Sequence, residues 1–129
     1  MNKYWKWIGI WIILAVMLTG CNSAQPQDPQ TDPVKITLNT NPPTPAVGNI
    51  ELVLELKDPQ GQPLTGATVD VSADHTDMSG MTMNGLATEQ EDGKYAITAD
   101  FSMSGNWKVT VYVRKGALDF KKDFELKIP

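Results

Sequence analysis

From residue 34 to the C-terminus, apolar side chains recur at every second position, and this alternation constrains the fold more than any other feature. Residues 50, 52, 54 and 56 are isoleucine or leucine, whereas Glu51 and Glu55 stand between them. Such period-two alternation is typical of strands with one buried and one solvated face. It predicts strands over residues 34–38, 50–56, 67–73, 94–101, 107–113 and 118–128. Residues 34–129 show no convincing helical periodicity, so the sequence predicts an all-β domain.

Turn signals separate the alternating segments. Asp58-Pro59-Gln60-Gly61 fits a type I turn, and Asp92-Gly93 and Lys115-Gly116 fit hairpin turns. Asn84-Gly85 is a further strong hairpin signal, which would pair Met83 with Leu86 and Met81 with Thr88. Seven or eight short strands with this spacing predict an immunoglobulin-like β-sandwich. The cysteine pair usual in such sandwiches is missing, and a small closed barrel is the alternative.

The last alternating segment, Leu118–Ile128, contains one exception to its pattern. Lys122 stands there at a position that faces inward by parity. A buried lysine without a partner would be costly. We therefore expect either a β-bulge or an exposed sheet edge at this residue.

The first twenty residues are predicted to be a signal peptide rather than part of the fold. Lys3 and Lys6 precede an apolar run from Trp7 to Leu18, which is too short to span a bilayer comfortably. The run ends in Leu18-Thr19-Gly20-Cys21, which resembles the bacterial lipobox. That resemblance implies cleavage before Cys21, a lipid on its thiol, and a domain anchored at the extracytoplasmic face of a bacterial membrane. An uncleaved N-terminal anchor is the alternative.

Composition narrows the function classes. Cys21 is the only cysteine, which excludes a disulfide, a redox thiol and a cysteine-based zinc site in the folded domain. Residues 1–20 hold two lysines and no acid, so nine basic and fifteen acidic residues remain without them, a net charge near −6. This charge argues against nucleic acid as a partner. Residues 21–33, rich in Gln, Pro and Asp, predict a flexible tether, followed by one domain over residues 34–129.

The stretch from Asp74 to Gly85 is the most distinctive part of the chain. It holds the only histidine and three of the six methionines. Imidazole and thioether form a soft ligand set, which selects copper(I) among common biological metals. Met103 has the same parity as Phe101 and is a further candidate from a neighbouring strand. The predicted metal ligands are His75, Met78, Met81, Met83 and Met103.

Other interpretations of this stretch stay open. Methionine fills irregular core space well, so Met81, Met83 and Met103 could close the core instead. Exposed methionines could also consume oxidants. His75 could be a solvated loop residue hydrogen-bonded to a carboxylate. Copper(II) or zinc held by His75 with Asp74 and Asp77 is a weaker alternative, and calcium is weaker still.

Four motifs stand in a fixed order over roughly residues 47–113. They are Asp58-Pro59-Gln60-Gly61-Gln62-Pro63-Leu64-Thr65-Gly66-Ala67-Thr68-Val69, Met78-Ser79-Gly80-Met81-Thr82-Met83, Gly93-Lys94-Tyr95 and Phe101-Ser102-Met103-Ser104-Gly105-Asn106-Trp107. This set resembles the YtkA-like domains, which are related to FixH-like proteins. The resemblance implies a small extracytoplasmic immunoglobulin-like domain. FixH-like relatives are linked to copper supply for haem-copper oxidases, which agrees with the soft ligand set.

We do not expect an enzyme. His75 has no evident nucleophile partner, and neither a strained G-x-S-x-G turn nor a glycine-rich phosphate loop is present in the sequence. The first function hypothesis is a copper(I) carrier or chaperone, tethered at the membrane surface, that supplies a membrane oxidase or transporter. The second is a non-catalytic interaction module whose methionine loop is a hydrophobic contact surface.

Overall fold

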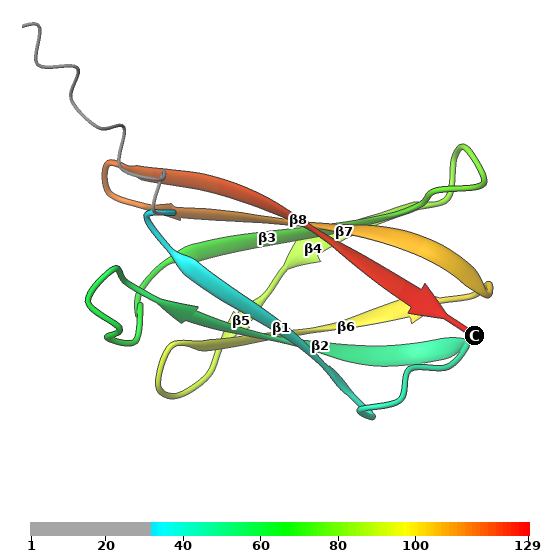
Figure 1. Cartoon of the computed structure of the whole chain (residues 1–129), viewed down its shortest axis with the longest axis horizontal. Helices are drawn as coiled ribbons and strands as arrows, with labels where there is room; N and C mark the ends of the chain where they lie inside the picture. Colours follow the sequence, from blue (N-terminus) through cyan, green and yellow to red (C-terminus); the bar gives the residue numbers. More distant parts are fainter. Residues whose placement is uncertain (1–31) are drawn as a thin grey trace, which may run out of the picture. The chain divides into compact units, whose positions relative to one another are not determined.

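The structure, a computed structural model, describes residues 32–129 and is built from strands alone. Two four-stranded antiparallel sheets pack face to face, with strand orders β1-β2-β6-β5 and β4-β3-β7-β8 (Figure 1). The strands are β1 Lys35–Asn41, β2 Gly48–Lys57, β3 Thr68–His75, β4 Thr82–Leu86, β5 Thr88–Glu89, β6 Lys94–Phe101, β7 Gly105–Lys115 and β8 Leu118–Ile128. The predicted β-sandwich is confirmed, and two separate sheets replace the closed barrel.

The core lies between the two sheets and consists of the residues that alternate inward. In β2, residues 50, 52, 54 and 56 are buried, and in β7 the same holds for residues 107, 109, 111 and 113. Tyr95 is fully buried, and its hydroxyl donates to the Leu64 carbonyl (2.9 Å) and accepts from the Ala67 amide (3.1 Å). Tyr95 thereby ties the β2–β3 connection to β6, because both of its partners lie in that connection.

Three of the predicted turns are confirmed. The Gly61 amide donates to the Asp58 carbonyl (2.9 Å), which closes the predicted turn after β2. Asp92 and Gly93 have φ values of 56° and 73° and join β5 to β6. Gly116, with φ 57°, turns β7 into β8.

The hairpin predicted at Asn84-Gly85 is wrong. β4 runs straight through both residues, which pair with Ser72 and Val71 of β3. Neither has the positive φ that this kind of turn requires. A Cβ on Gly85 would lie 2.9 Å from the Cδ1 atom of Ile97, so this glycine permits a close approach between the sheets.

The chain instead reverses over residues 76–81, before β4. Gly80 supplies the positive φ there, at 86°. The predicted pairings change with the turn. Met83 lies opposite Ala73 rather than Leu86, and the Met81 carbonyl accepts from the His75 amide (3.1 Å).

Lys122 lies on an exposed sheet edge. Of the two alternatives predicted for this residue, a β-bulge and an exposed edge, the structure therefore has the second. The β7–β8 register runs without a break from Gly105 opposite Ile128 to Lys115 opposite Leu118, so there is no bulge. The Lys122 ammonium lies 3.6 Å from the Asp32 carboxylate and 5.7 Å from the centre of the Phe124 ring. Its charge therefore has partners on the half-exposed inner side of β8.

The predicted signal peptide over residues 1–20, with Cys21 and most of the predicted tether over 21–33, lies outside the described residues. These segments and the lipid on Cys21 therefore stay predictions. Residues 32–129 contain no helix that could cross a membrane.

Candidate metal centre

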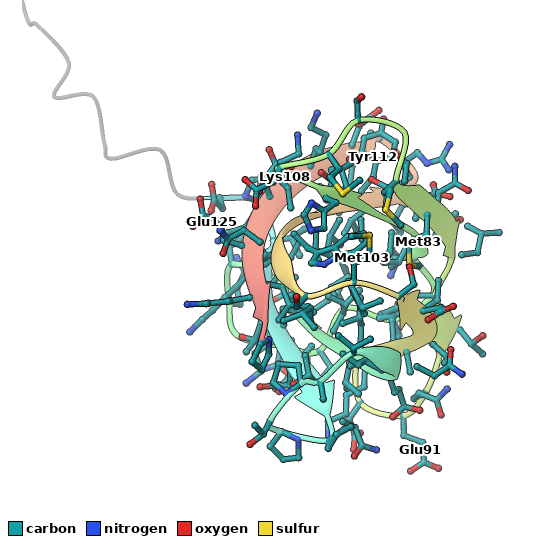
Figure 2. The ribbon with its side chains drawn as sticks, turned by 90° about the vertical axis from the view of Figure 1, so that its right-hand side faces the viewer. Met83, Glu91, Met103, Lys108, Tyr112 and Glu125 are labelled. Carbon is teal, nitrogen blue, oxygen red and sulfur yellow. The ribbon has the colours of Figure 1, made fainter. Side chains whose placement is uncertain are left out.

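The predicted ligands gather at one end of the sandwich. The β3–β4 loop and the β6–β7 connection meet at this end, on the right of Figure 1. Figure 2 looks onto it and shows Met83, near the start of β4, and Met103, in the β6–β7 connection, with the sulfur atoms in yellow. We call this the methionine end; it comprises residues 75–83 and 100–107.

His75 is the last residue of β3 and the buried polar side chain at this end, with 7% of its surface exposed. Its Nδ1 atom accepts from the Asp77 amide (3.2 Å), and its Nε2 atom lies 3.0 Å from the Ser104 carbonyl. Since an amide only donates and a carbonyl only accepts, this pattern fits the neutral ring with its proton on Nε2. The imidazole therefore links the β3–β4 loop to the β6–β7 connection. The alternative of a solvated histidine bonded to a carboxylate is wrong.

Gly105 makes room for this ring. A Cβ on Gly105 would lie 2.6 Å from Nε2 of His75, and the residue has φ +126°. Only glycine meets both conditions without strain. The G-x-W motif of the sequence thus contains a glycine that seats the histidine next to the tryptophan.

Met81 and Met83 occupy the same inward face. Met83 lies opposite the buried Ala73 in the β3–β4 ladder, and the carbonyl of Met81 bonds the amide of the buried His75. Both side chains are half-buried and pack against the core. They line a pocket of about 220 Å³, whose other lining residues are Gly80, Thr82, Asp100, Ser102 and Trp107. The structure thus places two thioether side chains in one pocket.

Trp107 is a residue of this pocket that the sequence reasoning did not single out. It lies opposite His75 in the β3–β7 ladder, and the two ring centres are 4.9 Å apart in an edge-to-face arrangement. The indole N–H donates to the Met103 carbonyl (3.1 Å), and Phe101 packs edge-to-face at 5.1 Å. The inward parity that Trp107 shares with Val109 was the available signal.

Met78 and Met103 lie at the solvent-exposed rim rather than in the pocket wall. Met78 is 46% exposed on the β3–β4 loop, and Met103 is 37% exposed on the β6–β7 connection. Neither they nor His75 line the pocket of Met81 and Met83. The five predicted ligands thus fall into a half-buried pair, an exposed pair and a hydrogen-bonded histidine.

The charged side chains around this end are spread out. Within residues 32–129, no three of His, Cys, Asp and Glu come close enough together to hold a metal ion. The pocket at this end combines two thioethers and one indole ring with the oxygen-bearing residues Thr82, Asp100 and Ser102. The thioethers are its soft, uncharged donors, and Asp100 is the one acidic residue among the lining residues.

The fold and the site together define a small β-sandwich with a thioether-lined pocket at one end. Residues 28–112 match the model of the YtkA-like family. The chain therefore belongs to the YtkA-like family, and the match extends further toward the N-terminus than the four sequence motifs. The comparison with characterised proteins found no match.

Solved structures share the fold at low identity. A copper-bound variant of FetP from uropathogenic Escherichia coli strain F11 is 13% identical over 76% of this chain and 91% of its own, with a TM-score of 0.51. The PmoD soluble domain from Methylocystis sp. ATCC 49242 is also 13% identical, over 76% of this chain and 92% of its own, with a TM-score of 0.51. FetP as isolated, expressed in the periplasm of E. coli, is 14% identical over 75% and 89%, again at 0.51. At such low identity, this structural similarity shows a shared fold and nothing more.

Proposed function

We propose that this protein is an extracytoplasmic copper(I) carrier, held at a membrane surface through Cys21, whose metal is bound by Met81 and Met83. The observation that carries the proposal is their common pocket, in which two half-buried thioethers lie on the same face of the sandwich. Copper(I) favours such ligands, whereas zinc, calcium and magnesium favour nitrogen, oxygen or thiolate. Thioethers need no deprotonation, so uptake by this pair releases no proton from it.

The exposed pair supplies the entry and exit route in this proposal. Met78 and Met103 come from the two loops that flank the pocket and are open to solvent. A metal held by weak thioether ligands passes to an acceptor by exchange of one ligand at a time. The acceptor class that we propose is a membrane oxidase or transporter. A variant of FetP, which shares the fold, has been solved with copper bound, and this supports the metal class.

His75 has a different role in the proposed site from that of the thioethers. Ligation through Nδ1 would cost the hydrogen bond from the Asp77 amide, and ligation through Nε2 would cost the bond to Ser104. Loss of either bond, which joins the buried ring to the backbone of an exposed residue, costs about 0.5–1.5 kcal/mol. We therefore propose that the thioethers bind the metal first and that His75 holds the two loops around the pocket. His75 would bind the metal only by giving up one of its two hydrogen bonds.

A copper(I) competition titration against a chromophoric chelator, under reducing and oxygen-free conditions, tests the proposal. The full chain should bind at most one equivalent. Met81→Leu/Met83→Leu should weaken binding by at least about tenfold, which corresponds to roughly 1.4 kcal/mol. Leucine keeps the volume and the apolar character, so loss of binding reports loss of sulfur.

The matched control is Met78→Leu/Met103→Leu, which removes the same number of thioethers from the rim. It should weaken equilibrium binding less than the pocket variant does and should slow transfer to the chelator. Equal affinity of the pocket variant and the unaltered chain would show that the carrier assignment to this pocket is wrong.

A second candidate function, a protein-interaction module, is favoured by the exposed apolar side chains. Met78 and Leu86 are 46% and 62% exposed, and both belong to the β3–β4 hairpin. Adaptable methionine surface is common at sites that bind proteins. The same titration separates the two functions, because a module of this kind has no need of copper(I) and leaves the chelator fully loaded.

A further inference from the structure

Within residues 32–129, β8 is the longest of the edge strands, with 11 residues, and among these residues it pairs with β7 on one side only. Lys115 and Leu118 flank a two-residue turn, so even-numbered residues of β8 exchange hydrogen bonds with β7. The backbone groups of odd-numbered residues 119–127 consequently point toward the free edge. A further strand would therefore pair through these odd-numbered residues.

The outer face of this edge carries charges of both signs, in the order −, +, −, −, + along the strand. The charged positions, all exposed, are Asp119, Lys121, Asp123, Glu125 and Lys127. The acids at 119 and 125 lie opposite cations of β7, at positions 114 and 108. The lysines at 121 and 127 lie opposite the uncharged residues 112 and 106. β7 therefore offers these two lysines no acidic cross-strand neighbour.

The charge order is most complementary to itself in one antiparallel register. When a second β8 is centred on Asp123, Lys121 faces Glu125 and Asp119 faces Lys127, each twice by symmetry. Centring on Lys121 instead would oppose Asp119 to Asp123. The one like-charged pair in the favoured register is Asp123 with its symmetry copy, and its carboxylate already accepts from the Thr110 hydroxyl (2.7 Å). Opposite charges directly across a ladder are favourable, and like charges are not.

The inner face of β8 fits the same register. Phe120, Phe124 and Leu126 are only half-buried, because the sandwich is open between β1 and β8. A groove of about 460 Å³ lies along this opening, lined in part by Leu38, Phe124 and Leu126. In the favoured register Phe120 faces Leu126 of the second copy, so both apolar rows lose water contact.

We propose that two copies of this chain associate through β8, in antiparallel pairing about a two-fold axis at Asp123, to form one continuous sheet across both. Lys122 is consistent with a second copy of this chain as the partner. An inward-pointing lysine on an edge strand disfavours pairing with unrelated strands, because its charge would be buried without a partner. In this register it faces Phe124 of the second copy and so meets a ring of the kind that it already contacts at 5.7 Å. The inference is independent of copper binding.

Cysteine cross-linking of the full chain tests the register. In a Cys21→Ser background, Asp123→Cys places its two thiols across the axis, at a spacing of about 5.5 Å between Cα atoms. A short bis-maleimide should therefore convert most of this variant into a covalent dimer. Asp119→Cys is the matched control, because its two copies would lie eight residues out of register, about 26 Å apart. No cross-linking at 123, or equal cross-linking at both positions, overturns the proposal.

A charge exchange tests the same pairing without a cross-linker. Lys121→Glu opposes like charges at both symmetric positions and should raise the dimer dissociation constant at least about tenfold in sedimentation experiments. Lys121→Glu/Glu125→Lys restores opposite charges in the dimer and should recover the affinity. A chain that stays monomeric up to high micromolar concentration, or a double variant that fails to recover, contradicts the proposal.

Discussion

At the scale of single residues, Tyr95 combines full burial with a hydroxyl that has two backbone partners. Burial raises the pKa of this hydroxyl above 10.0, and the nearby Glu89 carboxylate raises it further, whereas the hydrogen bond from the Ala67 amide partly offsets the rise. In the unfolded chain the tyrosine ionises near its ordinary pKa. The folded state therefore binds the proton more tightly than the unfolded state does.

This difference predicts a loss of stability in alkali. The contribution of Tyr95 is complete below pH 10.0 and falls as the pH rises through the folded pKa. Tyr95→Phe should lower the free energy of unfolding at pH 7 by about 1–3 kcal/mol, because two half-buried backbone groups lose their partner. Urea unfolding at pH 7 and above pH 10 measures both effects. The variant should show a shallower alkaline decline, and an unchanged decline would contradict the assignment to Tyr95.

Elements in this sandwich are kept in register by contacts between them rather than by their turns alone. The turn between β5 and β6 is hydrogen-bonded to β2, because the Leu56 amide donates to the Gly93 carbonyl (2.9 Å). A Cβ on Gly93 would lie 2.7 Å from the Leu56 carbonyl oxygen, which is backbone and cannot yield. On Gly85 the corresponding contact is the tip of the Ile97 side chain, at 2.9 Å, which can rotate.

These two glycines predict different costs for the same substitution. Gly93→Ala should destabilise the domain by about 2–4 kcal/mol, because it adds a backbone clash to the strain of φ 73°. Gly85→Ala should cost no more than about 1 kcal/mol, because Ile97 can shift and the extended backbone suits alanine. Thermal unfolding of both variants checks the order. Equal costs would show that the close approach between β4 and β6 is as rigid as that between β6 and β2.

At the scale of the whole domain, the methionine end and the start of β1 lie at opposite ends of the sandwich (Figure 1). The register agrees, because Lys35 pairs with the end of β2, whereas Gly48 at its beginning pairs with Phe101 near Met103. A protein anchored through the chain that precedes β1 can thus present the methionine pocket away from its point of attachment. This arrangement suits delivery of metal to a partner.

The anchoring itself is testable at Cys21. Cys21→Ser should abolish incorporation of a labelled fatty acid and should block processing at Gly20-Cys21, because the thiol is the only site for the lipid. Metabolic labelling with membrane fractionation measures both. The copper(I) affinity should stay unchanged, which serves as the control for folding. Labelling that persists without the thiol would contradict lipidation at Cys21.

The local sequence pattern was sufficient to predict the bounds of a strand wherever the alternation and the turn residues agreed. β6 begins and ends at Lys94 and Phe101 as predicted, because Asp92-Gly93 supplies the positive φ of the turn and the alternation continues without interruption. The local pattern failed to predict the structure at Asn84-Gly85, where cross-strand pairing with β3 outweighs the turn propensity of the dipeptide. A turn propensity is a local free energy of a few tenths to about one kcal/mol, which a ladder of several residues exceeds.

The candidate site divides in the same way. Which donors are present, and that they are soft, follows from His75 and the methionines as residues, so the chemical class needed no coordinates. Which donors share a pocket depends on segments far apart in the chain. His75 bonds Ser104 across 29 positions, and Trp107 reaches the pocket of Met81 and Met83 from another strand. Period-two alternation assigns a side chain to a face, whereas its neighbours on that face are set by strand order and by the packing of the two sheets.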